Sequence, residues 1–302
     1  MEYSIGNYKI GAVVVVFNPS ADLLHNCLNS LLGQVDCVCV VDNSSADNSA
    51  VLTSYGDKLK YIPLMFNKGI AAAQNIGIDY FCQNGYDFVV FSDQDSTSSD
   101  SLIKSLVEAY FVLSATVDIS CIGPMPVNRK TNRPYMYDQC VIDRCEYSGV
   151  RYFKMHSIIS SYSLVPVKNF AEVGRMEEKL FIDFVDLQWC WRAAACSNKV
   201  CVMLPEATIV HELGVSSKFL GHAISLSSPF RIYYQTRNLL WLCRKGYAPS
   251  YKENESKETG SKVLLLFRFP QTAVALFLAY AERCEGRTFK TRLIITISLW
   301  DI

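Results

Sequence analysis

The feature that most constrains this chain is an apolar run that ends in two carboxylates. Residues 88–93 read Phe-Val-Val-Phe-Ser-Asp, and Asp95 follows after a single glutamine. Such a run predicts a buried strand, and ligands bind at the carboxyl ends of strands in open α/β sheets. If the chain stays extended, Asp93 and Asp95 face the same side. The pattern indicates a site for a hard divalent cation, or a strand end that leads into a helix cap.

Strand and helix patterns alternate through the first half of the chain. The expected strands are residues 10–17, 37–41, 60–65 and the run from Phe88, and the expected helices are 21–32, 49–55, 68–83 and 99–115. Short loops between elements in this order predict an α/β fold, with a mostly parallel sheet wrapped on both faces by helices.

Polar residues follow each of these strands, so they should gather at one edge of the sheet. They are Asn18, Asp42, Asn67 and Asp93. No glycine-rich dinucleotide motif and no P-loop motif is present, so a nucleotide would be held through carboxylates, amides and a metal. Asp42 is a candidate for a hydrogen bond from a base or ribose, or for a helix cap.

The turn before the third expected helix offers a second kind of contact. Lys68 and the helix start after Gly69 would attract an anion, and the alternative is ordinary turn and cap chemistry.

Charge is balanced overall but divided along the chain. The 29 basic and 29 acidic residues argue against a nucleic-acid binder. Residues 229–302 hold 12 Lys/Arg against 6 Asp/Glu, whereas residues 1–228 hold 17 against 23. We therefore expect a catalytic domain over 1–228 and a basic, apolar helical region over 229–302.

The second region suggests contact with an anionic membrane surface. Its most apolar segment, residues 263–281, contains Arg268, Pro270 and Gln271, so it is not an uninterrupted span. A basic helix with an apolar face can lie in the headgroup layer instead. A helical packing layer or a homo-oligomer interface is the alternative.

Cysteine usage indicates a reducing compartment. The twelve cysteines lie mostly in apolar or helical runs, without CxxC spacing, and residues 1–9 do not resemble a signal peptide. We therefore expect buried thiols in a cytoplasmic protein.

Seven motifs in a fixed order resemble those of a known family. They are residues 14–18, 40–45, 67–77, 93–96, 181–193, 211–214 and 233–238. Together they resemble the family 2 glycosyltransferases of GT-A fold, and within that family the bacterial rhamnosyltransferases of O-antigen and other polysaccharide assembly. Each motif alone is weak, and their order carries the resemblance.

The resemblance implies roles for individual residues. Asp93 and Asp95 match the carboxylate pair that binds Mg²⁺ or Mn²⁺, with Asp95 as the direct ligand, and His211 completes the metal site or contacts the diphosphate. Asp186 matches the catalytic base, with Asp183 as a second candidate. The implied donor-binding residues are Asn18, Asp42, Asn67, Lys68, Gly69, Asn75 and Asp93.

The implied activity is metal-dependent, inverting transfer of a sugar from a nucleotide-diphospho-sugar, with dTDP-L-rhamnose as the expected donor. The acceptor would be a saccharide on undecaprenyl diphosphate, at the inner face of the bacterial cell membrane. A sugar nucleotidyltransferase is an alternative, although it needs a Gly-rich, basic loop where residues 18–21 read Asn-Pro-Ser-Ala. A non-catalytic sugar-binding or scaffold protein is another, because Val185 replaces the family's usual glutamate.

Overall fold

The computed structural model describes residues 8–128, 134, 140–211, 216–219, 222–225 and 229–245. The chain divides into two compact units. The first comprises Met1–Phe181 and Val185–Glu212, and the second comprises Ile182–Phe184 and Leu213–Ile302. Three residues just before Asp186 therefore group with the C-terminal unit.

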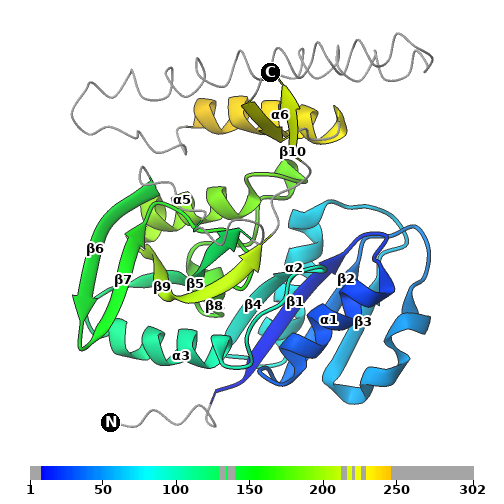
Figure 1. Cartoon of the computed structure of the whole chain (residues 1–302), viewed down its shortest axis with the longest axis horizontal. Coiled ribbons are helices and arrows are strands. Elements are labelled where there is room, and N and C mark those ends of the chain that lie inside the picture. Colours follow the sequence, from blue (N-terminus) through cyan, green and yellow to red (C-terminus); the bar gives the residue numbers. More distant parts are fainter. Residues whose placement is uncertain are drawn as a thin grey trace. The chain divides into compact units, whose positions relative to one another are not determined.

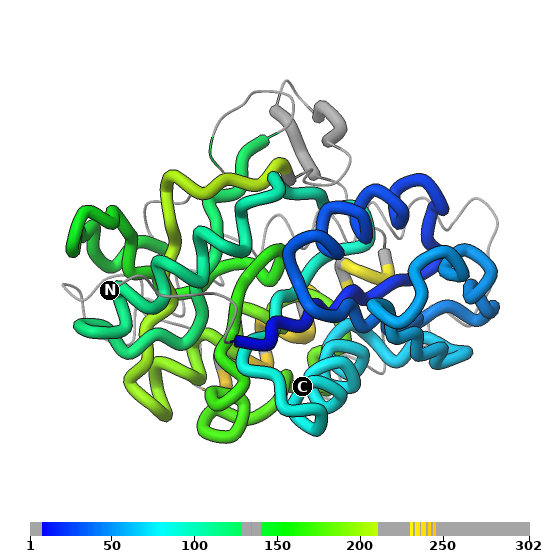
Figure 2. The backbone as a smooth tube through the Cα atoms, turned by 90° about the horizontal axis from the view of Figure 1, so that it is seen from below, coloured from blue at the N-terminus to red at the C-terminus, as the bar shows by residue number. Residues whose placement is uncertain are grey.

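The first unit is built on a nine-stranded sheet (Figure 1). In chain order the strands are β1 Ile10–Val16, β2 Cys37–Asp42, β3 Leu59–Pro63, β4 Phe88–Asp93, β5 Ile119–Asn128, β6 Val141–Tyr147, β7 Val150–Met155, β8 Leu164–Pro166 and β9 Val200–His211. Their order across the sheet is β3-β2-β1-β4-β8-β5-β9-β7-β6. Figure 2 follows the same backbone from below.

The direction of the strands changes across the sheet. Strands β1 to β4 pair in parallel, as do β5 and β9, whereas β8 runs antiparallel to both β4 and β5. Strands β6 and β7 form a hairpin around Ser148 and Gly149, both with positive φ, as a tight two-residue hairpin turn requires. The predicted α/β architecture is confirmed, while the antiparallel part was not foreseen.

Helices of the first unit flank this sheet. They are α1 Ala21–Leu32, the 3₁₀ helix Ser49–Lys58, α2 Ile70–Gln83, α3 Leu102–Leu113, α4 Asn169–Glu172, a 3₁₀ turn at Glu178–Leu180, and α5 Val185–Ser197. The helix expected over 49–55 is therefore a 3₁₀ helix, and its path bends at Gly56, where φ is +57°.

Opposite faces of the parallel strands receive different helices. Leu28 of α1 and Leu106 of α3 share one buried cluster with Val14 of β1. On the other face α2 approaches closely, since a Cβ on Gly77 would lie 2.6 Å from Val13. Side chains alternate between faces along a strand, so β1 is buried on both sides. This burial fixes the strand ends that carry the candidate site.

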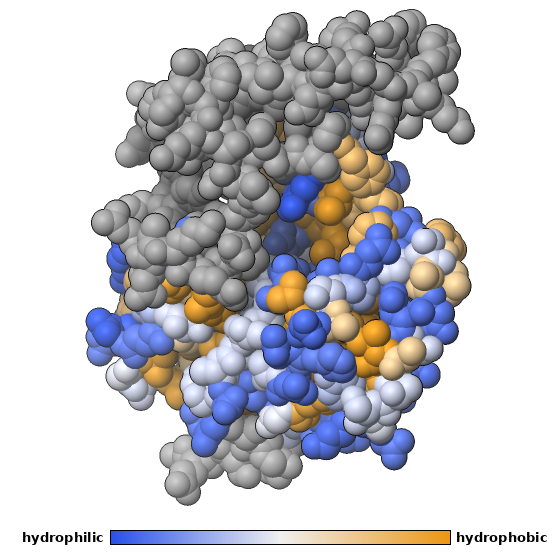
Figure 3. Space-filling model, turned by 45° about the vertical axis from the view of Figure 1, so that its right-hand side comes forward, coloured by the Kyte–Doolittle hydropathy of each residue, from blue (hydrophilic) through white to orange (hydrophobic). Residues whose placement is uncertain are grey.

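The second unit contains a two-stranded hairpin, β10 Ser216–Phe219 with β11 His222–Ser225, and the helix α6 Pro229–Lys245. None of the helices in the described ranges is long and apolar enough to cross a bilayer. The segment 263–281 and the membrane contact predicted from it lie outside the described residues. On the face in Figure 3, hydrophobic and hydrophilic side chains intermingle over the coloured surface.

Candidate active site

The register of the parallel strands brings two of the predicted carboxylates to one edge. Asp42 lies opposite Val16 at the end of β1, and Asp93 lies opposite Val15. The carboxyl ends of β1, β2 and β4 therefore form a common rim, as the strand pattern predicted. The ligand-binding edge of an open α/β sheet is built in this way.

The chain does not stay extended after Asp93, so the condition under which Asp93 and Asp95 would face the same side is not met. Strand β4 ends there, and the Ser96 amide donates to the Asp93 carbonyl at 3.1 Å, which closes a turn around Gln94 and Asp95. Asp is favoured at the first position of such turns. Gln94 ties this turn to β1, because its Oε1 accepts from the Phe17 amide at 2.8 Å. Asp95 is left exposed to solvent.

Two adjacent serines connect the predicted metal-binding and catalytic carboxylates. The Ser161 hydroxyl donates to Asp93 Oδ2, and the Ser160 amide donates to Asp186 Oδ2 at 3.0 Å. Asp93 and Asp186 therefore belong to one site. Neither serine was predicted from the sequence, and the signal that could have identified them is the polar Ser-Ser pair ahead of β8.

Asp186 has the environment expected of a general base. It lies in the first turn of α5 and accepts from the Leu187 amide at 2.9 Å as well as from Ser160. The pKa of Asp186 is raised from 3.8 to about 6, chiefly by burial and also by the neighbouring Cys190 and the Asp93 carboxylate, while the hydrogen bonds from the Leu187 and Ser160 amides lower it. As a whole residue, Asp186 is partly exposed.

Asp183 lies in a different environment from Asp186. It precedes α5, has φ +64°, and accepts from Arg231 through Nε at 3.0 Å and a second guanidinium nitrogen at 2.8 Å. Asp183 therefore lies outside the helix that carries Asp186. Because its oxygens are engaged by a guanidinium, Asp183 is the weaker candidate for the base.

The start of α2 is capped by the chain itself. The Phe181 carbonyl accepts from the Ile70 amide at 2.7 Å and from the Ala71 amide at 3.4 Å. Asn67 Oδ1 accepts from the Gly69 amide at 2.9 Å, which forms a local turn. These contacts match the turn-and-cap alternative. Lys68 is exposed, with Nζ 5.1 Å from the centre of the Phe66 ring, and it remains the candidate for an anion.

Gly69 is required by this turn. Its φ is +87°, and a Cβ there would lie 2.6 Å from the Phe181 ring and 2.7 Å from the Phe181 carbonyl oxygen. We expect Gly69→Ala to lower the free energy of unfolding by about 2–4 kcal/mol, because both strain and overlap with backbone are introduced. Gly85→Ala is the control, since φ is +69° there and no atom lies within 4 Å of the added Cβ.

Urea denaturation of the two variants measures the difference. We expect Gly85→Ala to cost only about 1–2 kcal/mol, the cost of a left-handed conformation alone. Equal destabilisation of both variants would show that the close contact with Phe181 contributes nothing.

Asp42 is almost fully buried, at 1% exposure, and organises the loop after β2. It accepts from the Ser44 amide at 2.8 Å, Asn48 Nδ2 at 2.7 Å and the Tyr61 hydroxyl at 2.8 Å. Burial, and secondarily the Asp42 carboxylate, raise the pKa of Tyr61. These three donors use most of the roughly four acceptor positions of a carboxylate.

The other predicted donor residues occupy distinct places. Asn18 is exposed, with φ +46°, and its amide donates to Ser44 Oγ at 2.8 Å. Asn75 is buried, and its side-chain amide donates to the Met176 carbonyl at 3.0 Å and to Glu178 Oε1 at 2.9 Å. Asn75 thus fastens α2 to the segment before α5.

The metal assignment rests on Asp93 and Asp95. Carboxylate oxygens are the ligands that Mg²⁺ and Mn²⁺ prefer, so the pair at this turn fits such an ion. His211 ends β9, and its side chain lies outside the described part of the structure. Among the described side chains, a group of three potential ligands within 4.8 Å occurs only at Cys121, Cys190 and Cys201.

These three cysteines are buried between α5 and strands β5 and β9. Of the ten cysteines whose side chains are described, six are buried, three are partly exposed and Cys196 is exposed. The expectation of buried thiols therefore holds for six of these ten.

Two solved structures resemble this chain in fold. GalNAc-T7 with UDP, GalNAc and Mn²⁺ superposes with a TM-score of 0.56 at 12% identity, over 83% of this chain and 53% of that one. TarS of S. aureus superposes with a TM-score of 0.53 at 16% identity, over 86% of this chain and 42% of that one. This chain spans about half the length of these proteins, and the likeness establishes a GT-A type of fold.

Sequence comparison identifies the family. The family model described as Glycosyl transferase family 2 matches residues 12–174. A curated relative, the dTDP-rhamnosyl transferase RfbF of Shigella flexneri, is 34% identical over 254 residues, which cover 80% of this chain and 82% of the relative. The chain belongs to glycosyl transferase family 2 and is a glycosyltransferase, so the nucleotidyltransferase and non-catalytic alternatives are set aside.

Proposed function

We propose that this enzyme transfers L-rhamnose from dTDP-L-rhamnose to a saccharide acceptor, with inversion at the sugar carbon. The observation that carries the donor assignment is the 34% identity to a dTDP-rhamnosyl transferase over four fifths of both chains. The site supports the reaction class, because a carboxylate suited to proton transfer and a carboxylate pair suited to a cation are linked through Ser160 and Ser161.

Asp186 is the proposed general base. In an inverting transfer the acceptor hydroxyl attacks from the face opposite the leaving nucleotide, and it must lose a proton as the new bond forms. A base is most effective when its pKa lies near the working pH. With a pKa raised by burial to about 6, Asp186 is largely ionised at neutral pH and is a stronger base than an ordinary aspartate.

Asp93 and Asp95 are the proposed ligands of a divalent cation, with Asp95 as the direct ligand and His211 as a further candidate. Such a cation, when bound, neutralises the negative charge that develops on the departing diphosphate. Ser161 and Gln94 hold the residues of this turn in place through their contacts with Asp93 and Phe17. Lys68, exposed beside α2, is proposed to contact the same diphosphate.

The nucleotide is proposed to lie over the rim formed by β1 and β2. Asp42, held by three donors, is the proposed acceptor for the thymine imide or the ribose. Asn18, Asn67 and Gly69 shape the two loops beside it. These assignments rest on the placement of the residues along one edge of the sheet and on the family resemblance.

The acceptor is proposed to be a saccharide on a lipid diphosphate at the cytoplasmic face of the cell membrane, in polysaccharide or O-antigen assembly. The excess of basic over acidic residues in 229–302 supports contact with an anionic surface. Flotation with vesicles containing anionic lipid tests this part independently of the reaction.

A donor panel tests the proposed function. We expect release of dTDP from dTDP-L-rhamnose, with Mn²⁺ or Mg²⁺, to be at least about 10-fold faster than nucleotide release from UDP- or GDP-sugars, because hydrogen-bonding groups that lose their partners in a mismatched ligand reduce kcat/KM. dTDP-D-glucose carries the same nucleotide with a different sugar, so it separates a preference for the sugar from a preference for the nucleotide. Faster turnover of a UDP- or GDP-sugar would overturn the donor assignment.

A further inference from the structure

The segment that leads into α5 has an unusual backbone. Phe181, Asp183 and Phe184 have φ values of +62°, +64° and +65°. Residues with a Cβ rarely adopt this left-handed conformation, because Cβ then crowds the backbone. Such conformations persist where the surroundings enforce them, and they concentrate at functional sites. In this chain the three left-handed residues lie in the short segment before Asp186, and the last of them, Phe184, is two residues ahead of it.

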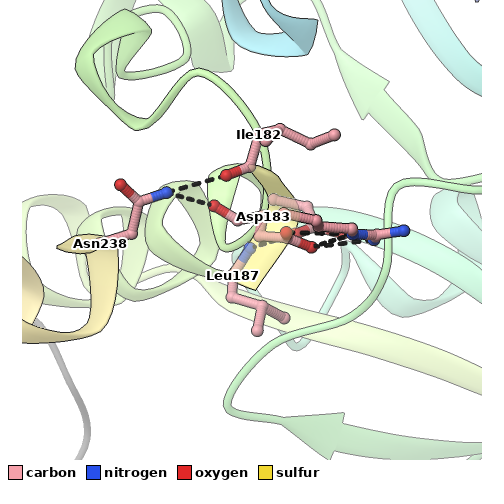
Figure 4. A network of polar contacts seen from close by, with 6 residues as sticks. Ile182, Asp183, Leu187 and Asn238 are labelled. Carbon is pink, nitrogen blue, oxygen red and sulfur yellow. Dashed lines mark hydrogen bonds and ion pairs between the residues drawn. The ribbon is translucent and has the colours of Figure 1, made fainter. Parts of the chain in front are cut away.

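One contact comes from the amide of Asn238 in α6, which points at two successive carbonyl groups (Figure 4). Asn238 Nδ2 donates to the Ile182 carbonyl at 2.8 Å and to the Asp183 carbonyl at 3.0 Å. Its Oδ1 accepts from Arg237 at 2.7 and 3.1 Å. Asn238 is 1% exposed. Both protons of its amide group are therefore used to hold this segment.

A second contact from α6 is the ion pair between Arg231 and Asp183. Arg231 Nε lies 3.0 Å from both carboxylate oxygens, and a terminal nitrogen lies 2.8 Å from Oδ1. The carboxylate is 11% exposed, whereas the guanidinium is 52% exposed. Charge-assisted contacts through two guanidinium nitrogens fix orientation as well as distance.

The chain before and after this segment is fixed in the first unit. The Phe181 carbonyl caps α2, as described above, and Asp186 accepts from the Ser160 and Leu187 amides. Only Val185 separates Phe184 from Asp186. A change in the backbone at 182–184 would therefore change where α5 begins and the direction in which the Asp186 carboxylate points.

We propose that Asn238 and Arg231 are positioning residues for Asp186: by holding residues 182–184, of which Asp183 and Phe184 are left-handed, α6 sets the start of α5. The inference rests on the proposed role of Asp186 as the base. Under this proposal α6 has a role in the sugar-transfer step, in addition to the contact with a membrane proposed above. Displacement of a reacting group by about 1 Å can cost on the order of 100-fold in rate.

Steady-state kinetics of Asn238→Ala and Arg231→Ala test the proposal. We expect kcat to fall by about 10- to 100-fold, while the KM for the donor changes less than about 3-fold, because the donor contacts lie on other segments. Arg231→Lys should recover part of kcat, since it keeps the charge but loses the planar fork. Asn84→Ala and Arg151→Ala are matched controls for loss of an amide–carbonyl contact and of an exposed ion pair.

A double-variant cycle separates the ion pair from general damage. If Arg231 acts through Asp183, then Arg231→Ala combined with Asp183→Ala should lower kcat no more than the worse single variant. Multiplied losses in the double variant would overturn a shared role. Arg231 is half exposed, so this test stands even if Asn238→Ala fails to fold.

Hydrogen exchange supplies a readout that does not depend on the donor. We expect amides in residues 182–187 to exchange faster in Asn238→Ala and Arg231→Ala than in the wild type, with little change in β1 to β4. Unchanged exchange there, or unchanged kcat, would overturn the proposal. Inactivity of the wild type on dTDP-L-rhamnose would instead count against the proposed donor and leave the exchange result standing.

Discussion

Replacing Asp186 with Asn should lower kcat by at least about 100-fold, the scale of losing a general base, while the affinity for dTDP stays close to that of the wild type. The variant keeps the shape of the side chain but cannot accept the acceptor's proton. Single-turnover kinetics and calorimetric titration with dTDP measure the two quantities. Asp57→Asn, at an exposed position, is the control. Near-normal turnover of Asp186→Asn together with an inactive Asp183→Asn would reverse the assignment.

The pH dependence follows from the raised pKa of Asp186. Because the base must be ionised, kcat/KM in the wild type should fall about tenfold per pH unit below about pH 6. In Asp186→Asn this acid limb should disappear from the residual activity. An acid limb that stays near pH 4 in the wild type would show that the titrating group is not a buried carboxyl.

The raised pKa of Asp186 also affects the free energy of unfolding. Its effect has the opposite sign to that of a salt-bridged aspartate, whose pKa is lowered in the folded state. A folded-state pKa of about 6 against an ordinary 3.8 means that the native state binds the proton more tightly than the unfolded state. The ionised carboxylate therefore costs on the order of 3 kcal/mol above pH 6, and this cost is relieved as pH falls towards 4. The difference in unfolding free energy between wild type and Asp186→Asn should change by this amount over that window.

Replacing Asp95 with Ala should reduce transfer by at least about 1,000-fold, equivalent to about 4 kcal/mol of transition-state stabilisation. The exposed carboxylate of Asp95 is the proposed direct ligand of the cation that faces the diphosphate. Asp93→Ala should be milder, since Asp93 Oδ2 already accepts from Ser161.

Calorimetry gives this prediction a readout besides activity. Mn²⁺ should tighten dTDP binding to the wild type and to Asp100→Ala, an exposed control five residues further on, but not to Asp95→Ala. Full transfer activity in excess chelator would remove the metal assignment altogether.

Much of the fold follows from local patterns in the sequence. The strands β1, β2 and β4 and the helices between them lie within a few residues of their predicted limits, because short apolar runs and helical periodicity are read over a few residues at a time. The same reading placed Asp42 and Asp93 at one edge, since parallel strands present their carboxyl ends together. The antiparallel β8 has three residues and carried too little pattern to be found.

The sequence by itself determined the α/β architecture, the rim of polar residues and, through the order of its motifs, the glycosyltransferase family. Only the tertiary structure decided which group each carboxylate or amide contacts. Asp183 pairs with Arg231 across 48 residues, Ser161 reaches Asp93 across 68, and Asn75 fastens Met176 across 101. Strands and helices are encoded by residues that are neighbours in the sequence. The hydrogen bonds that orient a carboxylate and shift its pKa depend instead on which distant segments pack against it. No local sequence pattern predicts that packing.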